Sequence, residues 1–169
     1  MKRLFLLRHA KSSWDDPAMD DRDRPLNARG RRDAPHMAAY MQAKGYQPDL
    51  ALCSPSVRTR ETLDALKERI GEFPISYPET LYLADTNALR TAIAAANDDV
   101  SALLLVGHNP GMASLVAQLT DFESLDDAQR ISRFPTAALA VYETKAKHWA
   151  DLADKRLKLV DFMTPKMLP

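Results

Sequence analysis

The stretch Arg3-Leu4-Phe5-Leu6-Leu7-Arg8-His9 places an arginine and a histidine directly after a short run of bulky apolar residues. Such a run is typical of a buried strand. Two further apolar runs, 50–53 and 102–106, are followed by Arg58 and His108 respectively. In an open α/β sheet, ligands bind outside the carboxyl ends of the strands. If these runs are neighbouring parallel strands, two arginines and two histidines meet at one edge and can hold a phosphate.

The overall composition predicts a protein without a strong charge field. The 169 residues most simply form one domain, 1–169, and their 23 Lys and Arg balance 23 Asp and Glu, for a formal net charge of zero. A neutral chain has no long-range field to attract nucleic acid or an anionic membrane, so any anion recognition has to be local. No apolar run approaches the roughly 18 residues that span a bilayer, and the first run is too short for a signal peptide. We therefore expect a cytoplasmic protein with no nucleic-acid or membrane partner.

The first part of the chain predicts a strand over 2–8 and a charged loop over 11–25. Asn27 can cap a helix that extends to about Lys44. Pro35 lies inside this helix and should kink or restart it, because proline lacks the N–H that the helix needs.

A second strand is predicted over 49–53. Ser54 then supplies an N-cap and Pro55 the first helical position, for a helix that ends near Ile70 before Gly71. The middle of the chain predicts an irregular stretch or weak strand over 75–83, a helix over 86–97 and a strand over 101–106. A helix from Asn109-Pro110 to about Leu119 and a polar excursion over 121–135 follow. The last part predicts strands over 137–143 and 156–162. Alternation of strands and helices predicts an α/β fold with a parallel or mixed central sheet and helices on both faces.

Each of the three strand ends also has an ordinary interpretation. Arg8 and His9 can be a strand-end arginine and a surface or capping histidine, since short motifs often match by chance. Arg58 can be a solvated charge, and His108 a structural histidine. Their joint occurrence at three separate strand ends favours a phosphate site, in which a neutral imidazole attacks phosphorus and guanidiniums neutralise the charge. The residues alone do not decide which of the two histidines is the nucleophile.

A series of motifs between residues 7 and 137 stands in a fixed order along the chain. They are Leu7-Arg8-His9-Ala10-Lys11-Ser12, Arg24-Pro25-Leu26-Asn27-x-x-Gly30, Ser54-Pro55-x-x-Arg58-Thr59-x-x-Thr62, Leu105-Val106-Gly107-His108-Asn109-Pro110-Gly111 and Phe134-Pro135-Thr136-Ala137. In combination they resemble the histidine phosphatase superfamily, which also contains the cofactor-dependent phosphoglycerate mutases, and more narrowly the SixA-type phosphohistidine phosphatases. The resemblance implies a three-layer α/β/α sandwich with a mostly parallel central sheet, of the phosphoglycerate mutase-like type.

The resemblance also implies roles for individual residues. His9 would be the nucleophile that becomes phosphorylated, and Arg8, Arg58 and His108 would complete the phosphate pocket. Ser12 and Arg24, which lie within the matching motifs, are further candidates for phosphate binding. The chain departs from the family where Ala10 replaces a common glycine and Asn27 replaces a frequent threonine; both changes should be tolerated.

The general acid has no clear motif. Larger family members place a Glu or Asp in the middle of the chain to protonate the leaving oxygen, and here Glu79 and Asp85 are the candidates. The carboxylates of the first loop, Asp15, Asp16, Asp20 and Asp21, are expected to be solvated. An imidazole leaving group, with a pKa of about 6.5, needs less help from an acid than a phenol with a pKa of about 10. An indistinct acid therefore mildly favours phosphohistidine as the substrate.

We predict a metal-independent phosphatase that forms a phosphohistidine intermediate on His9 and needs no cofactor. The histidines lack close metal spacing, and no glycine-rich nucleotide loop is present. The spacing between Cys53 and Arg58 is one residue too short for the loop of the cysteine-dependent phosphatases, so Cys53 should pack as a small apolar residue. The predicted partner is a phosphorylated protein carrying phosphohistidine. The alternatives are a phosphatase of small phosphate esters or anhydrides and a non-catalytic module that recognises a phosphorylated partner, while a mutase is disfavoured by the short first loop.

Overall fold

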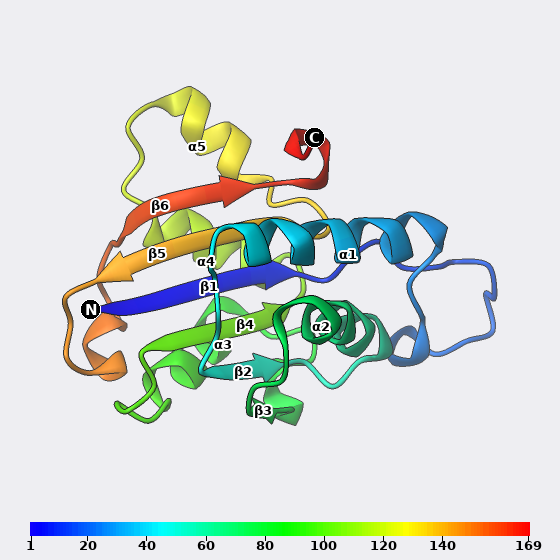
Figure 1. Cartoon of the computed structure of the whole chain (residues 1–169), viewed down its shortest axis with the longest axis horizontal. Helices are drawn as coiled ribbons and strands as arrows, with labels where there is room; N and C mark the ends of the chain where they lie inside the picture. Colours follow the sequence, from blue (N-terminus) through cyan, green and yellow to red (C-terminus); the bar gives the residue numbers. More distant parts are fainter.

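A computed structural model describes all 169 residues of the chain, around one six-stranded sheet (Figure 1). The strands are β1 (Lys2–Arg8), β2 (Leu50–Cys53), β3 (Ile75–Ser76), β4 (Ala102–Gly107), β5 (Leu139–Thr144) and β6 (Lys158–Met163). The α-helices are α1 (Ala28–Ala43), α2 (Val57–Ile70), α3 (Thr86–Ala94), α4 (Gly111–Leu119) and α5 (Leu125–Ser132). Short 3-10 helices lie at Asp21–Asp23 (η1), Glu79–Leu81 (η2), Trp149–Leu152 (η3) and Pro165–Met167 (η4).

The strand order β3-β2-β4-β1-β5-β6 puts β4 between β1 and β2. Strands β1, β4, β2 and β3 are parallel to one another, whereas β5 runs antiparallel to both β1 and β6. The three strands whose ends carry the candidate residues are therefore adjacent and point the same way (Figure 1). This arrangement confirms the predicted mixed, mostly parallel sheet.

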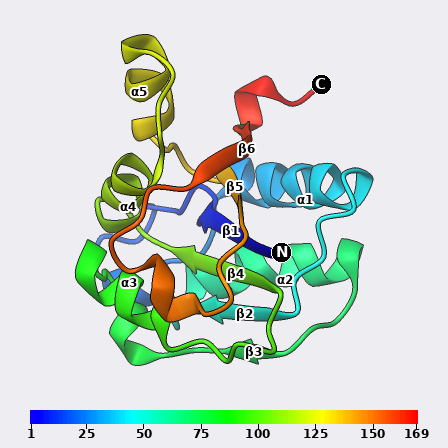
Figure 2. The same cartoon turned by 90° about the vertical axis from the view of Figure 1, so that its left-hand side faces the viewer.

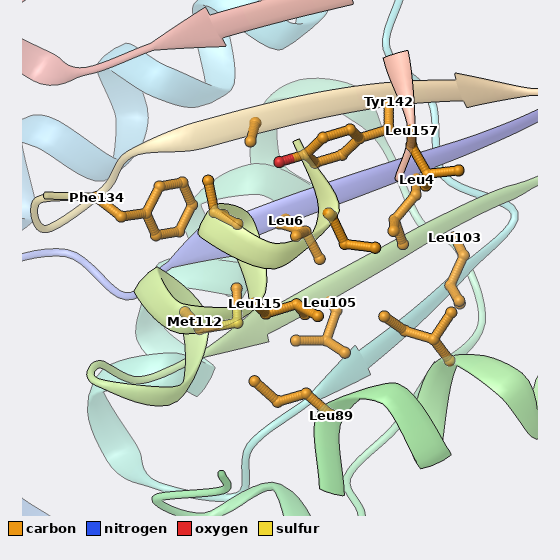
Figure 3. Close-up of a cluster of buried hydrophobic side chains, with 14 of the residues drawn as sticks. Leu4, Leu6, Leu89, Leu103, Leu105, Met112, Leu115, Phe134, Tyr142 and Leu157 are labelled. Atoms are coloured by element: carbon orange, nitrogen blue, oxygen red, sulfur yellow. The ribbon is translucent and has the colours of Figure 1, made fainter. Parts of the chain in front are cut away.

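Side chains of the central strands alternate between two cores, as the pleat of a strand requires. Leu4 and Leu6 of β1 pack into the core that α3 and α4 cover, together with side chains of β4 (Figure 3). Phe5 and Leu7 point to the opposite face and pack against α1 and α2. Helices thus cover both faces of the sheet, and the three-layer α/β/α architecture is confirmed (Figure 2).

Helix α1 begins as predicted, because the Asn27 side chain accepts a hydrogen bond from Gly30 N. The predicted restart at Pro35 is wrong: α1 continues through this residue to Ala43. Proline removes one backbone hydrogen bond, but Met37 and Met41 beyond it are fully buried against the sheet. That burial offsets the lost bond and keeps the helix in one piece.

Two other predicted helix boundaries are corrected by the structure. Ser56, rather than Ser54, caps α2 by accepting from Thr59 N, so the helix begins at Val57. The polar excursion over 121–135 contains the helix α5, whose N-cap Ser124 accepts from Asp127 N. This helix has only eight residues and buries only Ile131, so its apolar periodicity is too short to stand out in a polar stretch. In Figure 2, α5 stands away from the sheet on the same side as the C-terminal segment. None of the helices combines the length and the apolar character needed to cross a bilayer.

Candidate active site

Strand register brings the ends of β1, β2 and β4 together. Arg8 lies opposite Gly107 in the β1–β4 pair, and Cys53 lies opposite Val106 in the β2–β4 pair. The chain stays paired one residue further, since His9 N donates to the Gly107 carbonyl at 3.1 Å and Ser54 N donates to the Val106 carbonyl at 3.0 Å. The residues that follow the three strands therefore meet at one edge of the sheet.

A cavity of about 270 Å³ opens at this edge. It is lined by Arg8, His9, Lys11, Ser12, Trp14, Asp21, Arg24, Arg58, Leu83, His108, Asn109 and Thr136. The residues predicted from the sequence to bind phosphate all line this one pocket: Arg8, Ser12, Arg24, Arg58 and His108. Nowhere in the chain do three or more His, Cys, Asp or Glu side chains converge as they would around a metal ion.

His9 is buried and held in one orientation. Its Nδ1 lies 2.7 Å from the Ala10 carbonyl oxygen. A carbonyl only accepts, so Nδ1 carries the proton and Nε2 keeps its lone pair. Burial lowers the pKa of His9 to about 3; the bond to Ala10 opposes this shift, whereas His108, Arg58 and Arg8 act in the same direction as burial. The imidazole is therefore neutral at physiological pH and able to act as a nucleophile.

His108 is fixed from both of its ring nitrogens. Arg58 Nη2 lies 3.3 Å from His108 Nδ1, and because a guanidinium only donates, Nδ1 accepts. The proton then sits on Nε2, which donates to the Ser54 hydroxyl at 2.6 Å. Burial and the nearby charge of Arg58 lower the pKa of His108 to about 3. Its ring lies 5.3 Å from that of His9, centroid to centroid, so two neutral imidazoles share the pocket.

Arg8 is the least engaged arginine of the site. Its Nη1 donates to the Phe134 carbonyl at 3.4 Å, while its buried Nε has no hydrogen-bond partner. The same carbonyl accepts from the Asn109 side chain at 2.9 Å. Phe134 adopts a φ of 38°, in the left-handed region that side chains disfavour, and this turn presents the carbonyl to both donors. Arg8 lines the pocket and thus has hydrogen-bonding capacity that the protein leaves unused.

Arg58 comes from the first turn of α2 and is buried next to the carboxylate of Asp21. Its Nη1 donates to the Asp21 main-chain oxygen at 2.6 Å, and its Nη2 donates to Asp21 Oδ2 at 3.0 Å. The Tyr82 hydroxyl also donates to Oδ2. Partial burial raises the pKa of Asp21, but the hydrogen bonds from Tyr82, Arg24 and Arg58 outweigh it and hold the pKa well below its ordinary value. Asp21 is thus an ionised member of the site.

Arg24 and Ser12 line the pocket but bond mainly to their own loop. Arg24 donates to Ser12 Oγ, to the Ser13 carbonyl at 2.9 Å and to Asp21 Oδ1 at 2.8 Å. Its guanidinium carbon lies 3.2 Å from the centre of the Trp14 ring, a stacked arrangement. Arg24 therefore shapes the loop around the pocket as well as adding positive charge to it.

The two candidate acids, Glu79 and Asp85, do not line the pocket. Glu79 is exposed and binds Arg22 through both of its oxygens, at 2.6 and 2.7 Å. Asp85 caps α3 by accepting from Ala88 N at 2.8 Å. Both carboxylates have local structural partners, and the carboxylate that does line the pocket is Asp21, which was expected to be solvated.

The backbone after His9 is supported by α1 and α2. Ala10 N donates to Thr62 Oγ1 at 3.0 Å, and the Lys11 carbonyl accepts from Asn27 N at 2.9 Å. A Cβ added to Gly30 would lie 2.1 Å from the Lys11 oxygen, so α1 approaches this loop more closely than a side chain allows. These contacts keep the histidine-bearing loop in place.

From the sequence, Asp21 was expected to be solvated, and no role in the pocket was predicted for Tyr82 or for Ser54 as the partner of His108. Ser54 and Thr62 belong to the same motif as Arg58, and this shared motif could have indicated that both residues lie near the pocket. Asp21 lies in a loop with several other carboxylates, and Tyr82 in an irregular stretch, so nothing in their spacing distinguished them.

Fold and pocket together define an α/β protein with a cavity lined by arginines beside a neutral, buried histidine. The family model of the Histidine phosphatase superfamily (branch 1) matches residues 4–82. An uncharacterized protein of Mycobacterium tuberculosis is 37% identical over 164 residues, 95% of this chain and 100% of that protein. Phosphohistidine phosphatase SixA of Escherichia coli is 27% identical over 126 residues, 72% of this chain and 76% of the relative.

Solved structures show the same relationship. A candidate phosphohistidine phosphatase SixA from Agrobacterium tumefaciens is 35% identical, with a TM-score of 0.83 and coverage of 97% of this chain and 98% of that chain. The chain therefore belongs to the histidine phosphatase superfamily, and it is a phosphatase of the phosphoglycerate mutase-like fold.

Proposed function

We propose that this phosphatase transfers a phosphoryl group first to Nε2 of His9 and then to water. The observation that carries the proposal is the hydrogen bond from His9 Nδ1 to the Ala10 carbonyl, which leaves the Nε2 lone pair free within the pocket. In the first step Nε2 bonds to phosphorus as the bond to the leaving group breaks and the leaving group takes the electron pair. In the second step water attacks phosphorus, the N–P bond breaks, and inorganic phosphate and neutral His9 are regenerated.

The cationic residues of the pocket have separate tasks in this reaction. The guanidiniums of Arg8 and Arg58, which line the pocket, are placed to bind phosphoryl oxygens and to stabilise the charge that builds up on them. His108, held by Ser54 through Nε2, contacts Arg58 Nη2 through Nδ1 and so helps to position that guanidinium. These contacts would strengthen as the phosphoryl group moves between leaving group and His9.

We further propose phosphohistidine as the substrate. Asp21 is the only carboxylate that lines the pocket, and its paired, ionised state makes it a poor proton donor. An imidazole with a pKa of about 6.5 leaves readily and can take its proton from solvent, whereas an alkoxide leaving group needs a positioned acid. The similarity to phosphohistidine phosphatase SixA of Escherichia coli supports the same choice.

A protein is the better fit as the carrier of that phosphohistidine. Trp14 and Leu83 line the pocket and are 69% and 54% exposed, so apolar side chains surround its mouth. Exposed apolar residues that border a polar pocket favour contact with another protein over contact with a small, fully hydrated ester.

The test compares hydrolysis of a phosphohistidine peptide with that of an aryl phosphate and a sugar phosphate. Wild-type protein should hydrolyse the phosphohistidine peptide with the highest kcat/KM. Incubation with ³²P-labelled peptide and acid-free quenching should trap label on the protein, and His9→Ala should abolish both label and turnover.

His108→Ala is the matched variant, because it removes the second imidazole of the pocket but leaves the nucleophile. It should retain labelling at a reduced rate. Equal labelling of His9→Ala and wild type would refute the assignment of the nucleophile. A preference for the sugar phosphate would replace the phosphohistidine substrate with a small ester, and binding without turnover of any of the three would identify a recognition module.

A further inference from the structure

The carboxylate of Asp21 occupies the cationic side of the pocket. Its Oδ1 accepts from Arg24 at 2.8 Å, and its Oδ2 accepts from Arg58 at 3.0 Å and from the Tyr82 hydroxyl. Guanidinium and hydroxyl donors arranged around two anionic oxygens are the donors that a phosphoryl group binds. The negative charge in this part of the site is therefore supplied by the protein itself.

Arg58 makes no side-chain hydrogen bond outside this arrangement. Its Nη1 donates to the Asp21 main-chain oxygen, and its Nη2 contacts Asp21 Oδ2 and His108 Nδ1. The two Nη groups form the fork with which arginine binds two oxygens of one anion. Asp21 Oδ2 already engages Nη2, so a phosphoryl oxygen that binds Nη2 from the same side has to take the place of this carboxylate oxygen. Arg8 differs, since its Nε is unpaired.

The two partners differ in their freedom to move. The Arg58 side chain is 4% exposed, whereas that of Asp21 is 42% exposed. The loop that carries Asp21 is anchored elsewhere, by pairing of Ser12 with Leu26 at its base and by the ion pair between Arg22 and Glu79. The Asp21 side chain can therefore turn toward solvent while Arg58 and the loop stay in position.

We propose that Asp21 is an intramolecular anion that neutralises Arg58 and Arg24 in the empty site, is displaced by the incoming phosphoryl group, and returns as inorganic phosphate leaves. The exchange keeps the buried arginines paired at every stage, which avoids the penalty of an isolated buried charge. It also weakens the binding of the product, because phosphate has to compete with a carboxylate tethered to the same loop. The inference rests on the proposed function only in taking this pocket as the phosphoryl site.

The inference is tested by binding inorganic phosphate to the full chain without any substrate. Isothermal titration at pH 7.5 and fixed ionic strength compares wild type with Asp21→Asn, which preserves size and removes the charge. The Kd for phosphate should fall about tenfold, because a competing like charge has been removed. A residue that served only to position Arg58 would give the opposite result, a higher Kd.

Asp20→Asn is the matched control. It removes the same charge from the neighbouring residue. Asp20 is exposed, and although it precedes η1, its side chain does not cap that helix. Its Kd should stay within about twofold of wild type. An unchanged or raised Kd in Asp21→Asn, or an equal fall in Asp20→Asn, would overturn the inference.

Tyr82→Phe provides a second route if Asp21→Asn does not fold. It removes the hydroxyl that holds Asp21 but keeps the charge and the ring, and should lower the Kd about threefold. An unchanged Kd in this variant counts against the inference. Failure of the proposed function would give a different result. Wild type would then form no labelled His9, while the order of phosphate affinities among wild type, Asp21→Asn, Asp20→Asn and Tyr82→Phe would stay as expected above.

Discussion

The Nε2 atom of His108 lies 2.6 Å from the hydroxyl of Ser54, so the ends of β4 and β2 are joined through side chains as well as through the sheet. Ser54 and Ser56 both precede α2, yet only Ser56 caps the helix. Ser54 therefore serves the pocket, whereas Ser56 stabilises the helix.

We expect Ser54→Ala to lower kcat/KM about tenfold, because the ring of His108 loses one of the two hydrogen bonds that orient it. Ser56→Ala should instead lower the free energy of unfolding by about 1 kcal/mol through loss of the cap, with activity nearly unchanged. Steady-state kinetics and urea unfolding of both variants check the pair. The reverse pattern would show that His108 does not depend on Ser54.

Acid should destabilise the fold before the carboxylates titrate. Burial lowers the pKa of both His9 and His108 from 6.5 to about 3, so each is neutral when folded and takes up a proton when unfolded. The unfolded state then binds more protons below pH 6.5, and the free energy of unfolding should fall as the pH drops from about 6.5 to 4.5. Urea unfolding at several pH values gives the slope of the free energy of unfolding against pH.

The double variant His9→Asn, His108→Asn should flatten that slope over the same pH interval. Replacement of the exposed His36 by Asn is the control and should leave the slope as in wild type. A slope that survives in the double variant would assign the acid sensitivity to other groups.

The carboxylates Glu79 and Asp85 should contribute to structure rather than to proton transfer. Loss of a general acid lowers rates by about 10²–10⁴-fold, whereas we expect Glu79→Gln and Asp85→Ala to change kcat/KM for the phosphohistidine peptide by less than about threefold. Asp85→Ala should in addition reduce stability by about 1 kcal/mol, since it removes the cap of α3. A hundredfold loss of kcat in either variant would restore that residue as the acid.

Gly30→Ala should disturb the histidine-bearing loop from the side of α1. The added Cβ would lie 2.1 Å from the Lys11 oxygen, so either the helix or the loop has to move. We expect a loss of about 1–3 kcal/mol in stability together with reduced phosphate affinity. Arg29→Ala, at the preceding exposed position of the helix, controls for helix propensity. A Gly30→Ala protein as stable as wild type would show that the close approach is not required.

Much of the fold and of the pocket follows from patterns that are local in the sequence. The buried strands are short apolar runs, and Arg8, His9 and His108 follow them directly, so parallel pairing of β1, β4 and β2 is enough to bring these residues together. Arg58 reaches the same edge because α2 starts there. The order of the strands and the start of α2 are thus enough to predict that these four residues meet.

The parts that could not be predicted depend on contacts between distant segments. Asp21 differs from the other carboxylates of its loop only because Arg58 and Tyr82 are near it in space. Pro35 leaves α1 intact because tertiary packing outweighs a local preference. Ser54 resembles a helix cap until its contact with His108 is known. Helix α5 has only eight residues and buries only Ile131, so it is too short for its apolar periodicity to stand out in a polar stretch.

The central position of β1 in the sheet has a consequence for how the protein is made. Arg3 pairs with Ala102 on one side and with Glu143 on the other, so the first strand to be synthesised finds both of its partners late in the chain. Folding that depends on such distant pairings is slow compared with the formation of local structure. A growing chain therefore exposes an unpaired apolar strand, and His9 gains its buried surroundings only after β5 has left the ribosome.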